Sequence, residues 1–442
     1  IIKIDQLVEW PDLEAVKQGD RAMNMILTKS QIGLDGVPAA ETVLSHVDGE
    51  RGELIIAGEH VASLAGKSSF EGVTARLWNG ATGKSLSEAN VRASLGAARE
   101  RAFARLPDLL PATRGMSVVD GFRAAIAGLR GENGLEHEAT IVGAFPVIAG
   151  ALVQQAKGHD PIAPDPNVSH AADTLHMLLG RKAAPREVAA LDAYLVTVCD
   201  HGMNASTFTT RVIASTQADL FAAITGGYCA LTGPLHGGAP EPVLEMLDAI
   251  GTRERIKPWV DGALAHGERL MGFGHRVYRV RDPRADVLKV AIERLEASGA
   301  DLPFAGEVEA YIREALRKKN PERPLETNVE FFTAILLDGL GIPRQAFTPI
   351  FAVARAAGER VYAGTLCRER PARLRVDETG AGTNEQEAKR GLDGAANGFT
   401  GAASHRGQAD RGDDADEECR YGEDLIDKEV RYSKKKVHED AP

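Results

Sequence analysis

The feature that most limits the fold of this chain is the helical spacing of its apolar residues between about residue 70 and residue 350. Segments such as TIVGAFPVIAGALVQQAKG and REVAALDAYLVTVCDHGMNAS repeat apolar residues every three or four positions. Strand-like alternation is nearly absent after residue 65, which disfavours a parallel-sheet nucleotide-binding fold. We therefore expect a mainly α-helical protein. One exception comes early: AETVLSHVDGERGELIIAGEH has two alternating apolar runs around a turn at 48–52 and predicts a short N-terminal β-hairpin.

Length and charge narrow the class of protein further. A chain of 442 residues suggests two or three domains. Its net charge of −11 argues against a general nucleic-acid or membrane-surface binder, although it leaves room for a small basic pocket that holds an anionic metabolite. No secretory or transit segment is visible, and the longest nearly uncharged apolar run, 141–153, is too short to span a bilayer.

The cysteines indicate the cellular compartment in which the protein works. Four are widely spaced without a C-x-x-C pair, so the sequence suggests neither a disulfide framework nor a zinc ribbon. Cys199 and Cys229 lie in apolar helical stretches, where we expect buried, reduced thiols. We therefore predict a cytoplasmic protein.

The composition changes sharply at Glu359. Only 10 of the 84 residues from there to the end are Ile, Leu, Val or Phe. A segment so poor in bulky apolar groups does not offset the entropy of ordering itself. We expect residues 359–442 to form an atypical, largely disordered tail, with 359–375 the less certain part.

Four polar clusters interrupt the helical pattern. The first is GPLHGGAP, in which His236 directly precedes a predicted helix. The partial positive charge at a helix N-terminus disfavours imidazolium, so His236 should stay neutral and donate one N–H, a device that supports enolisation. The alternative is a histidine that merely fills a turn.

The second cluster, GFGHRVYRVRDPR, carries His275 and four arginines close together. Arginine suits paired hydrogen bonds to carboxylate or phosphate, which suggests a site for a small anion. The alternative is an exposed, charged helix start.

The third and fourth clusters are TNVEFF, with Glu330, and DHGMNAST, with His201. Taken alone, Glu330 could simply complement a helix dipole, and the second segment could be a capping network. None of the four clusters has metal-ligand spacing, and no P-loop or G-x-S-x-G elbow is present.

Together and in this order, the clusters resemble the citrate synthase family. The matching segments are DHxxNAST, GPLHGGA, GFGHRVY, DPR, NVEF and FAVAR, and the resemblance covers about residues 28–358. It implies a mostly α-helical homodimer that condenses acetyl-CoA with oxaloacetate to citrate and CoA. A large domain (1–225 and 336–358) and a smaller domain (226–335) would close over the substrates. No tightly bound cofactor is implied, because the CoA thioester is a co-substrate.

The resemblance also implies roles for single residues. His236 matches the histidine that hydrogen-bonds the thioester carbonyl, and His275 the histidine that polarises the keto group. Glu330 stands where most members have the catalytic Asp. The positions that match oxaloacetate-binding residues are His201, Arg284 and Arg355. The positions that match the CoA site are Met271, Gly272, Phe273, Gly274 and Arg279.

Several departures from the family pattern matter. Glu330 is one methylene longer than the usual Asp, and Gly202 replaces a frequent Glu. After Gly358 the family's Trp, Ala-His pair and late Arg-Pro segment are missing, and Arg370-Pro371 follows too soon to replace the latter. Two rival functions stay open: a 2-methylcitrate synthase that uses propionyl-CoA, and a catalytically impaired protein that only binds these ligands. A single methylene changes discrimination by only about 1–3 kcal/mol, so the sequence does not separate the two acyl-CoAs.

Overall fold

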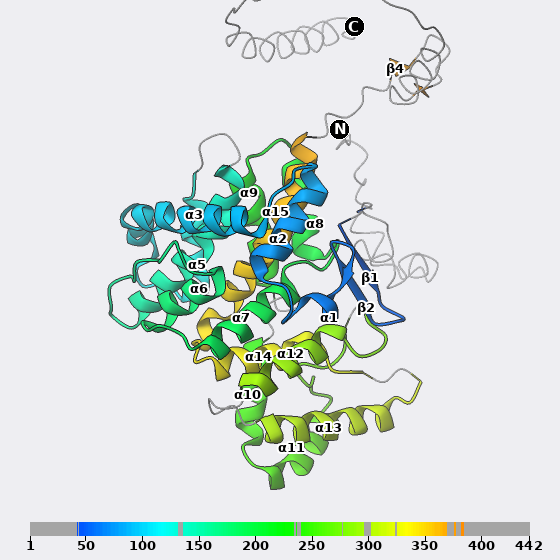
Figure 1. The fold of residues 1–442 in the computed structure, drawn as a ribbon. Helices are drawn as coiled ribbons and strands as arrows, with labels where there is room; N and C mark the ends of the chain where they lie inside the picture. Colours follow the sequence, from blue (N-terminus) through cyan, green and yellow to red (C-terminus); the bar gives the residue numbers. More distant parts are fainter. Residues whose placement is uncertain are drawn as a thin grey trace, which may run out of the picture. The chain divides into compact units, whose positions relative to one another are not determined.

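The computed structural model describes residues 42, 44–130, 136–233, 236, 240–275, 277–295, 302–322 and 325–368, together with the short segments 375–376 and 382–383. Helices dominate this part of the chain (Figure 1). They are α1 (Val61–Leu64), α2 (Phe70–Thr82), α3 (Glu88–Leu109), α4 (Val118–Ala127), α5 (Glu136–Ala156), α6 (His170–Leu179), α7 (Pro185–Val198), α8 (Ala205–Ser215), α9 (Leu220–Leu231), α10 (Pro240–Ile250), α11 (Arg253–Ala265), α12 (Pro283–Leu295), α13 (Leu302–Lys319), α14 (Val329–Gly339) and α15 (Phe347–Arg368), with 3-10 turns at Leu110–Thr113 and Arg344–Ala346. The prediction of a mainly α-helical fold is confirmed.

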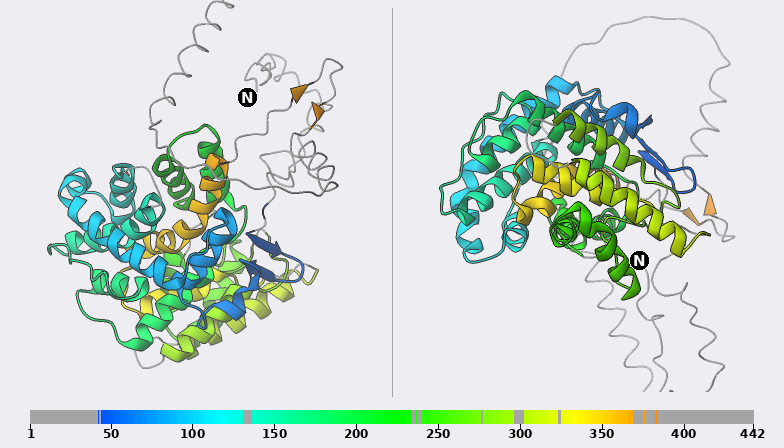
Figure 2. Two further views of the ribbon diagram at one scale, coloured as in Figure 1. Left: turned by 45° about the horizontal axis from the view of Figure 1, so that its top comes forward. Right: turned by 90° about the horizontal axis from the view of Figure 1, so that it is seen from below.

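The predicted hairpin is also present. Strands β1 (Ser45–Asp48) and β2 (Glu53–Ile56) pair antiparallel, with Asp48 opposite Glu53, and β3 (Glu59–His60) adds to β2. The Asp48 side chain accepts the backbone N–H groups of Glu50 and Arg51, which fixes the turn. The hairpin lies beside α1 and α12, at the margin of the helical body (Figure 2).

Polar side chains set where several helices begin. Ser69, Ser87, Ser117 and Ser169 each accept a backbone N–H from the first turn of the helix that follows. Two further caps, Asn204 on α8 and Asn328 on α14, belong to the polar clusters found in the sequence. These side chains satisfy donors that a helix N-terminus leaves open.

Helices α5 and α15 form the centre of the core. The stretch Ala139–Ala156 of α5 is long and apolar enough to cross a membrane, but most of it is buried inside the protein, as in the core helix of a globular domain. α15 packs against α2, α5, α7, α8 and α9, while α10–α14 pack mainly among themselves, and α12 also contacts α7. The predicted division into large and small domains stays a prediction.

α15 runs past the composition change at Glu359. The helix continues to Arg368, and Glu359, Arg360, Val361 and Tyr362 are buried. The first four residues of the predicted tail therefore belong to the core. Beyond residue 371, the described residues form one ladder, β4 (Arg375–Val376) with β5 (Gly382–Thr383). The rest of the predicted disordered tail lies outside the described residues, as does Arg370-Pro371.

The two cysteines in apolar helices differ. Cys199 is a buried free thiol, as expected, and burial raises its pKa above the usual range. Cys229 is exposed, so its expected burial is wrong. It lies on α9, and the helical pattern alone does not say which face of that helix meets the core.

Candidate active site

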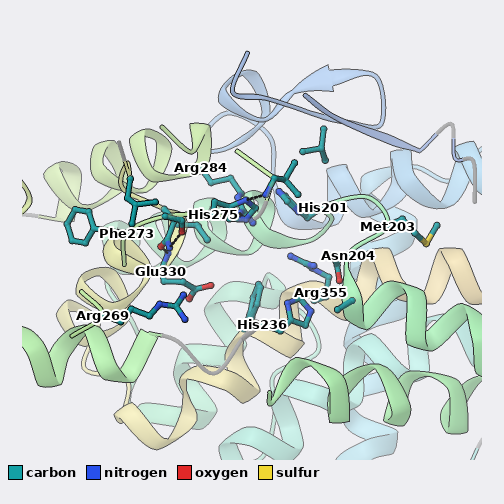
Figure 3. Close-up of a pocket in the computed structure, with 18 residues that line it drawn as sticks. His201, Met203, Asn204, His236, Arg269, Phe273, His275, Arg284, Glu330 and Arg355 are labelled. Carbon is teal, nitrogen blue, oxygen red and sulfur yellow. Dashed lines mark hydrogen bonds between the residues drawn. The ribbon is translucent and has the colours of Figure 1, made fainter. Parts of the chain in front are cut away.

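The polar clusters come together around one cavity of about 720 Å³ (Figure 3). It is bounded by β1, the turn between α7 and α8, the loop before α12, the start of α14 and the inner face of α15. All six side chains predicted to act on the substrates line it: His201, His236, His275, Arg284, Glu330 and Arg355. Residues up to 154 positions apart in the chain therefore meet at one site.

His201 lies in the turn between α7 and α8. The turn bends back through Gly202, at a φ of +58°, and ends at Asn204, whose side chain caps α8. His201 Nε2 lies 3.1 Å from the hydroxyl of Tyr278, and its ring meets that of His275 edge to face at 5.6 Å between centroids. Burial and the nearby Arg284 keep the pKa of His201 well below its ordinary value, so the ring is neutral.

His236 is held against the N-terminus of α8. Its Nε2 lies 2.9 Å from Ser206 Oγ and 3.3 Å from the backbone N of Ser206. Because a backbone N–H can only donate, Nε2 accepts, and the neutral ring carries its proton on Nδ1. The helix end that disfavours imidazolium is therefore that of α8, whereas the sequence pointed to the helix that follows His236, α10.

The loop that carries His275 is built on glycines. Gly272 has a φ of +83°, and a Cβ there would stand 2.9 Å from Phe331 Cβ on α14, so only glycine fits. Asn328 pins the same loop: its N–H donates to Gly272 O at 2.9 Å and its side-chain amide donates to Gly274 O at 2.8 Å. The start of α14 and the histidine loop are therefore fixed to each other.

The same loop sets the tautomer of His275. Its Nδ1 accepts the backbone N–H groups of Val277 and Tyr278, both at 3.1 Å. These bonds are shorter than the 3.4 Å contact between Nε2 and the Arg284 guanidinium, which can also only donate, so we place the proton on Nε2. Burial, aided by the Arg284 guanidinium 3.4 Å from Nε2, lowers the pKa of His275 to about 4. His275 is a neutral N–H donor at the edge of the cavity.

Two buried arginines supply positive charge. Arg284 pairs with Asp282 at 2.7 Å, and Asp282 also accepts the first N–H of α14 from Val329. Arg355 donates through Nε to Val198 O at 2.8 Å and lies over the Phe351 ring. Arg355 also lines the cavity, where a carboxylate can pair with its guanidinium.

Glu330 is the carboxyl group of the site. It stands in the first turn of α14, and Figure 3 shows it directed toward the space between His236 and His275. Among the described residues its carboxylate has no hydrogen-bond partner. Burial, opposed by Arg284, raises the pKa of Glu330 to about 7, which suits a general base near neutral pH.

The predicted CoA positions are only partly assembled. Phe273 and Gly274 line the cavity, whereas Met271 packs on the core and Gly272 on α14. Arg279 borders neither this cavity nor the second cavity described next. Its N–H donates to Gly49 O in the hairpin turn at 2.8 Å, and its side chain lies 3.9 Å from Glu50.

Sequence reasoning missed two basic residues. A second cavity, of about 530 Å³, shares Arg269, Phe273 and Leu325 with the first and has Lys319 on its wall. Arg269 precedes the MGFGH segment by one residue, Leu270, and could have been included with it. Lys319 closes α13, 44 residues further on than His275, so no local motif marks it.

Comparisons with known proteins agree with this geometry. The family model for the C-terminal domain of citrate synthase matches residues 33–360. The chain is 37% identical over 349 residues to a citrate synthase of Haloferax volcanii, which covers 74% of this chain and 89% of that protein. It is 36% identical over 356 residues to a citrate synthase of Synechocystis, with 76% and 88% covered. The structure of citrate synthase from Thermotoga maritima superimposes with a TM-score of 0.67 at 31% identity, over 75% of this chain and 90% of that one.

Proposed function

The chain belongs to the citrate synthase family, and from that premise we propose how its residues carry out the condensation of acetyl-CoA with oxaloacetate. The enzyme is an acyltransferase that joins the methyl carbon of the acetyl group to the keto carbon of oxaloacetate. Hydrolysis of the resulting thioester by water releases citrate and CoA. The observation that carries the proposal is that Glu330, His236 and His275 border one cavity between two arginines.

The first step is proton removal from the acetyl methyl group. Glu330 accepts this proton, since its raised pKa makes it a stronger base than an exposed carboxylate. His236 stabilises the enolate that forms, because its Nδ1–H donates to the thioester oxygen while Ser206 holds Nε2. A neutral histidine can act in this way without first losing a proton.

The second step joins the two carbon atoms. The enolate carbon attacks the keto carbon, and the alkoxide that forms at the keto oxygen is stabilised by a hydrogen bond from His275 Nε2–H and takes up a proton from water. Arg284 and Arg355 bind the two carboxylates of oxaloacetate, and His201 lies beside them in contact with Tyr278. The acyl-CoA would extend into the second cavity, where Arg269 and Lys319 suit its phosphates.

The assay is thiol release from acetyl-CoA in the presence of oxaloacetate. We expect release that depends on oxaloacetate, and the same assay with propionyl-CoA decides the acyl preference. A higher kcat/KM with propionyl-CoA would make the protein a 2-methylcitrate synthase. No release, with oxaloacetate still raising the melting temperature, would make it a binding protein. A variant whose segment after Gly358 is rebuilt to the family pattern shows whether that segment limits turnover.

We further propose that the protein is a cytoplasmic homodimer. The family resemblance supports the dimer, and the buried free thiol of Cys199 is compatible with a reducing compartment. Light scattering should give twice the chain mass of 47.2 kDa. Cell fractionation tests the location.

A further inference from the structure

A tyrosine beyond the family-like part of the chain reaches the back of the active site. Tyr362 lies on α15, four residues after Gly358, and only 1% of its surface is exposed. Its hydroxyl lies 2.9 Å from Ser45 Oγ on β1 and donates to Asp200 Oδ2 at 3.4 Å. One buried hydroxyl thus joins the N-terminal hairpin, the last core helix and the turn before α8.

Asp200 depends on few donors. It is completely buried, and its Oδ2 also accepts the Gly202 N–H at 3.4 Å. Its Oδ1 has no hydrogen-bond partner among the described residues and is packed toward Gly358, where a Cβ would stand 2.8 Å away. Burial raises the pKa of Asp200, and the hydrogen bond from Ser45, the charge of Arg355 and the hydrogen bond from Tyr362 all oppose that increase. If one of these hydrogen bonds is lost, the Asp200 carboxylate is held less firmly, because few other donors are within reach.

Asp200 is followed directly by His201. The segment 199–203 is the whole connection between α7 and the Asn204 cap of α8, so a shift of Asp200 moves the His201 backbone. His201 in turn lies against Tyr278 and lines the cavity. Two residues, Asp200 and His201, therefore connect the Tyr362 hydroxyl to the cavity.

We propose that Tyr362 is a positioning residue for His201 and acts by holding Asp200. The proposal gives the segment after Gly358 a part in substrate binding, although its sequence departs from the family pattern. It rests on the proposed function only for the identity of the ligand, oxaloacetate. The positioning itself is a property of the free protein.

The test compares two tyrosines that each lose a buried hydroxyl. Tyr362→Phe removes the contacts to Ser45 and Asp200. Tyr228→Phe removes a hydrogen bond of 3.1 Å to Val119 O, away from the cavity, and is the matched control. Hydrogen exchange of the segment 199–204, followed by mass spectrometry without ligand, reports the turn directly. We expect exchange about tenfold faster in Tyr362→Phe and unchanged in Tyr228→Phe.

Binding and kinetics then separate positioning from general stability. Calorimetry without acyl-CoA should show oxaloacetate binding weakened about tenfold in Tyr362→Phe, with kcat and the KM for acetyl-CoA changed much less. If Tyr362→Phe does not fold, Ser45→Ala, which removes the 2.9 Å contact, should show the same pattern.

The outcomes distinguish two failures. A wild-type protein that does not bind oxaloacetate would overturn the proposed function, whereas the exchange measurement would still decide the role of Tyr362. Exchange in 199–204 that is equal in the wild type and Tyr362→Phe, or that rises equally in Tyr228→Phe, would overturn the positioning role.

Discussion

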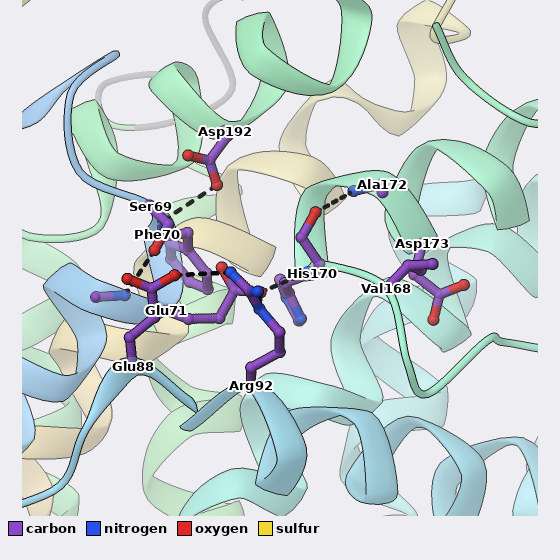
Figure 4. Close-up of polar contacts among 12 residues, drawn as sticks. Ser69, Phe70, Glu71, Glu88, Arg92, Val168, His170, Ala172, Asp173 and Asp192 are labelled. Carbon is purple, nitrogen blue, oxygen red and sulfur yellow. Dashed lines mark hydrogen bonds and ion pairs between the residues drawn. The ribbon is translucent and has the colours of Figure 1, made fainter. Parts of the chain in front are cut away.

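Two buried arginines in this molecule do opposite things. Arg99 on α3 contacts Asp173 and His170, two residues of the buried polar cluster drawn in Figure 4, and Arg355 on α15 lies at the active-site cavity. Both side chains are almost completely buried, a state that is costly for a charge unless it is paired. Their surroundings show how a structural charge differs from one kept for a ligand.

The nitrogens of Arg99 are used by the protein. Nε pairs with Asp173, Nη1 meets His170 Nδ1 at 3.3 Å, and Nη2 donates to the carbonyls of Asp165 and Val168. The backbone N–H of His170 donates to the buried Glu71 at 2.8 Å, which extends the cluster to α2. Because protein groups occupy its donors, the Arg99 guanidinium stabilises the packing of these helices.

Within the described part of the chain, Arg355 makes one hydrogen bond. Its Nε donates to Val198 O, and the residue borders the cavity together with His201 and Glu330. Three carboxyls interact with its charge, Glu359, Asp200 and Glu330, and burial raises the pKa of all three. The cavity therefore keeps positive charge and open donors for an anion, at a cost in stability that the core cluster does not bear.

The largest expected effect on activity comes from replacing Glu330, the proposed general base. Glu330→Gln keeps the shape of the side chain and removes its ability to accept a proton, so kcat should fall by about 10²–10⁴-fold. Oxaloacetate affinity and the urea midpoint should change little. In the wild type, the rate should rise with pH through about 7 as the carboxyl ionises. Near-full turnover of Glu330→Gln would show that another group is the base.

Arg99→Met should have the largest effect on stability. It leaves Asp173 as a buried charge without its partner, which typically costs about 3–5 kcal/mol. Urea unfolding gives the loss, and kcat per folded molecule should stay the same. The matched control is Arg105→Met on the same helix, since Arg105 lies 3.3 Å from Asp108 and the two side chains are 46% and 73% exposed; such a pair contributes about 0–1 kcal/mol. Equal losses in the two variants would remove the contrast between the buried and the exposed arginine.

A smaller effect concerns the charge behind Arg355. Burial raises the pKa of Glu359 to about 7, against the influence of the Ser206 hydroxyl and Arg355. Above that pH the ionised carboxyl competes with oxaloacetate for the field of Arg355, and Asp200 faces the same arginine from the turn before α8. Oxaloacetate should therefore bind more weakly at pH 8 than at pH 6, by about fivefold for an interaction of about 1 kcal/mol.

Glu359→Gln isolates this effect. The variant should bind oxaloacetate with a weaker pH dependence than the wild type, as measured by calorimetry at several pH values. The titration of Glu330 is common to both proteins and cancels in the comparison. Identical profiles would mean that Glu359 does not sense the ligand.

Removal of the C-terminal segment should have no measurable effect on stability or activity. A chain ended after Arg375 should keep the melting temperature and the activity of the parent, because residues 376–442 are poor in bulky apolar groups. Limited proteolysis should cut first in this region. A chain ended after Gly358 is the contrasting variant, since it loses the buried Val361 and Tyr362 and should melt earlier. A loss of stability on ending at Arg375 would mean that the tail contributes to the core.

What the sequence predicted well was encoded locally. The hairpin followed from alternation around the Asp48–Gly52 turn, and the capping network considered for DHGMNAST is present at Asn204. The six substrate-facing side chains were found because their motifs are short and specific, and the structure brings them to one cavity. Their roles in catalysis stay predictions.

What the sequence did not reveal depends on contacts between distant residues. The backbone of Arg279 is tied to Gly49, 230 positions away, and Lys319 reaches the second cavity only through the packing of α11 and α13. The low apolar content of the last 84 residues did not reveal that four of them are buried. An average composition over the whole segment conceals the apolar positions at its start that continue the helical spacing of α15.

The contact between Ser45 and Tyr362 has a consequence for synthesis of the protein. The two residues are 317 positions apart, and a ribosome needs on the order of 15–60 s to add that many residues. During that time the hairpin and the turn that holds His201 exist without the hydroxyl that joins them. The nascent chain therefore has no complete oxaloacetate site until its last core helix has emerged, and a chain that stops short of Tyr362 releases a protein with that site unfinished.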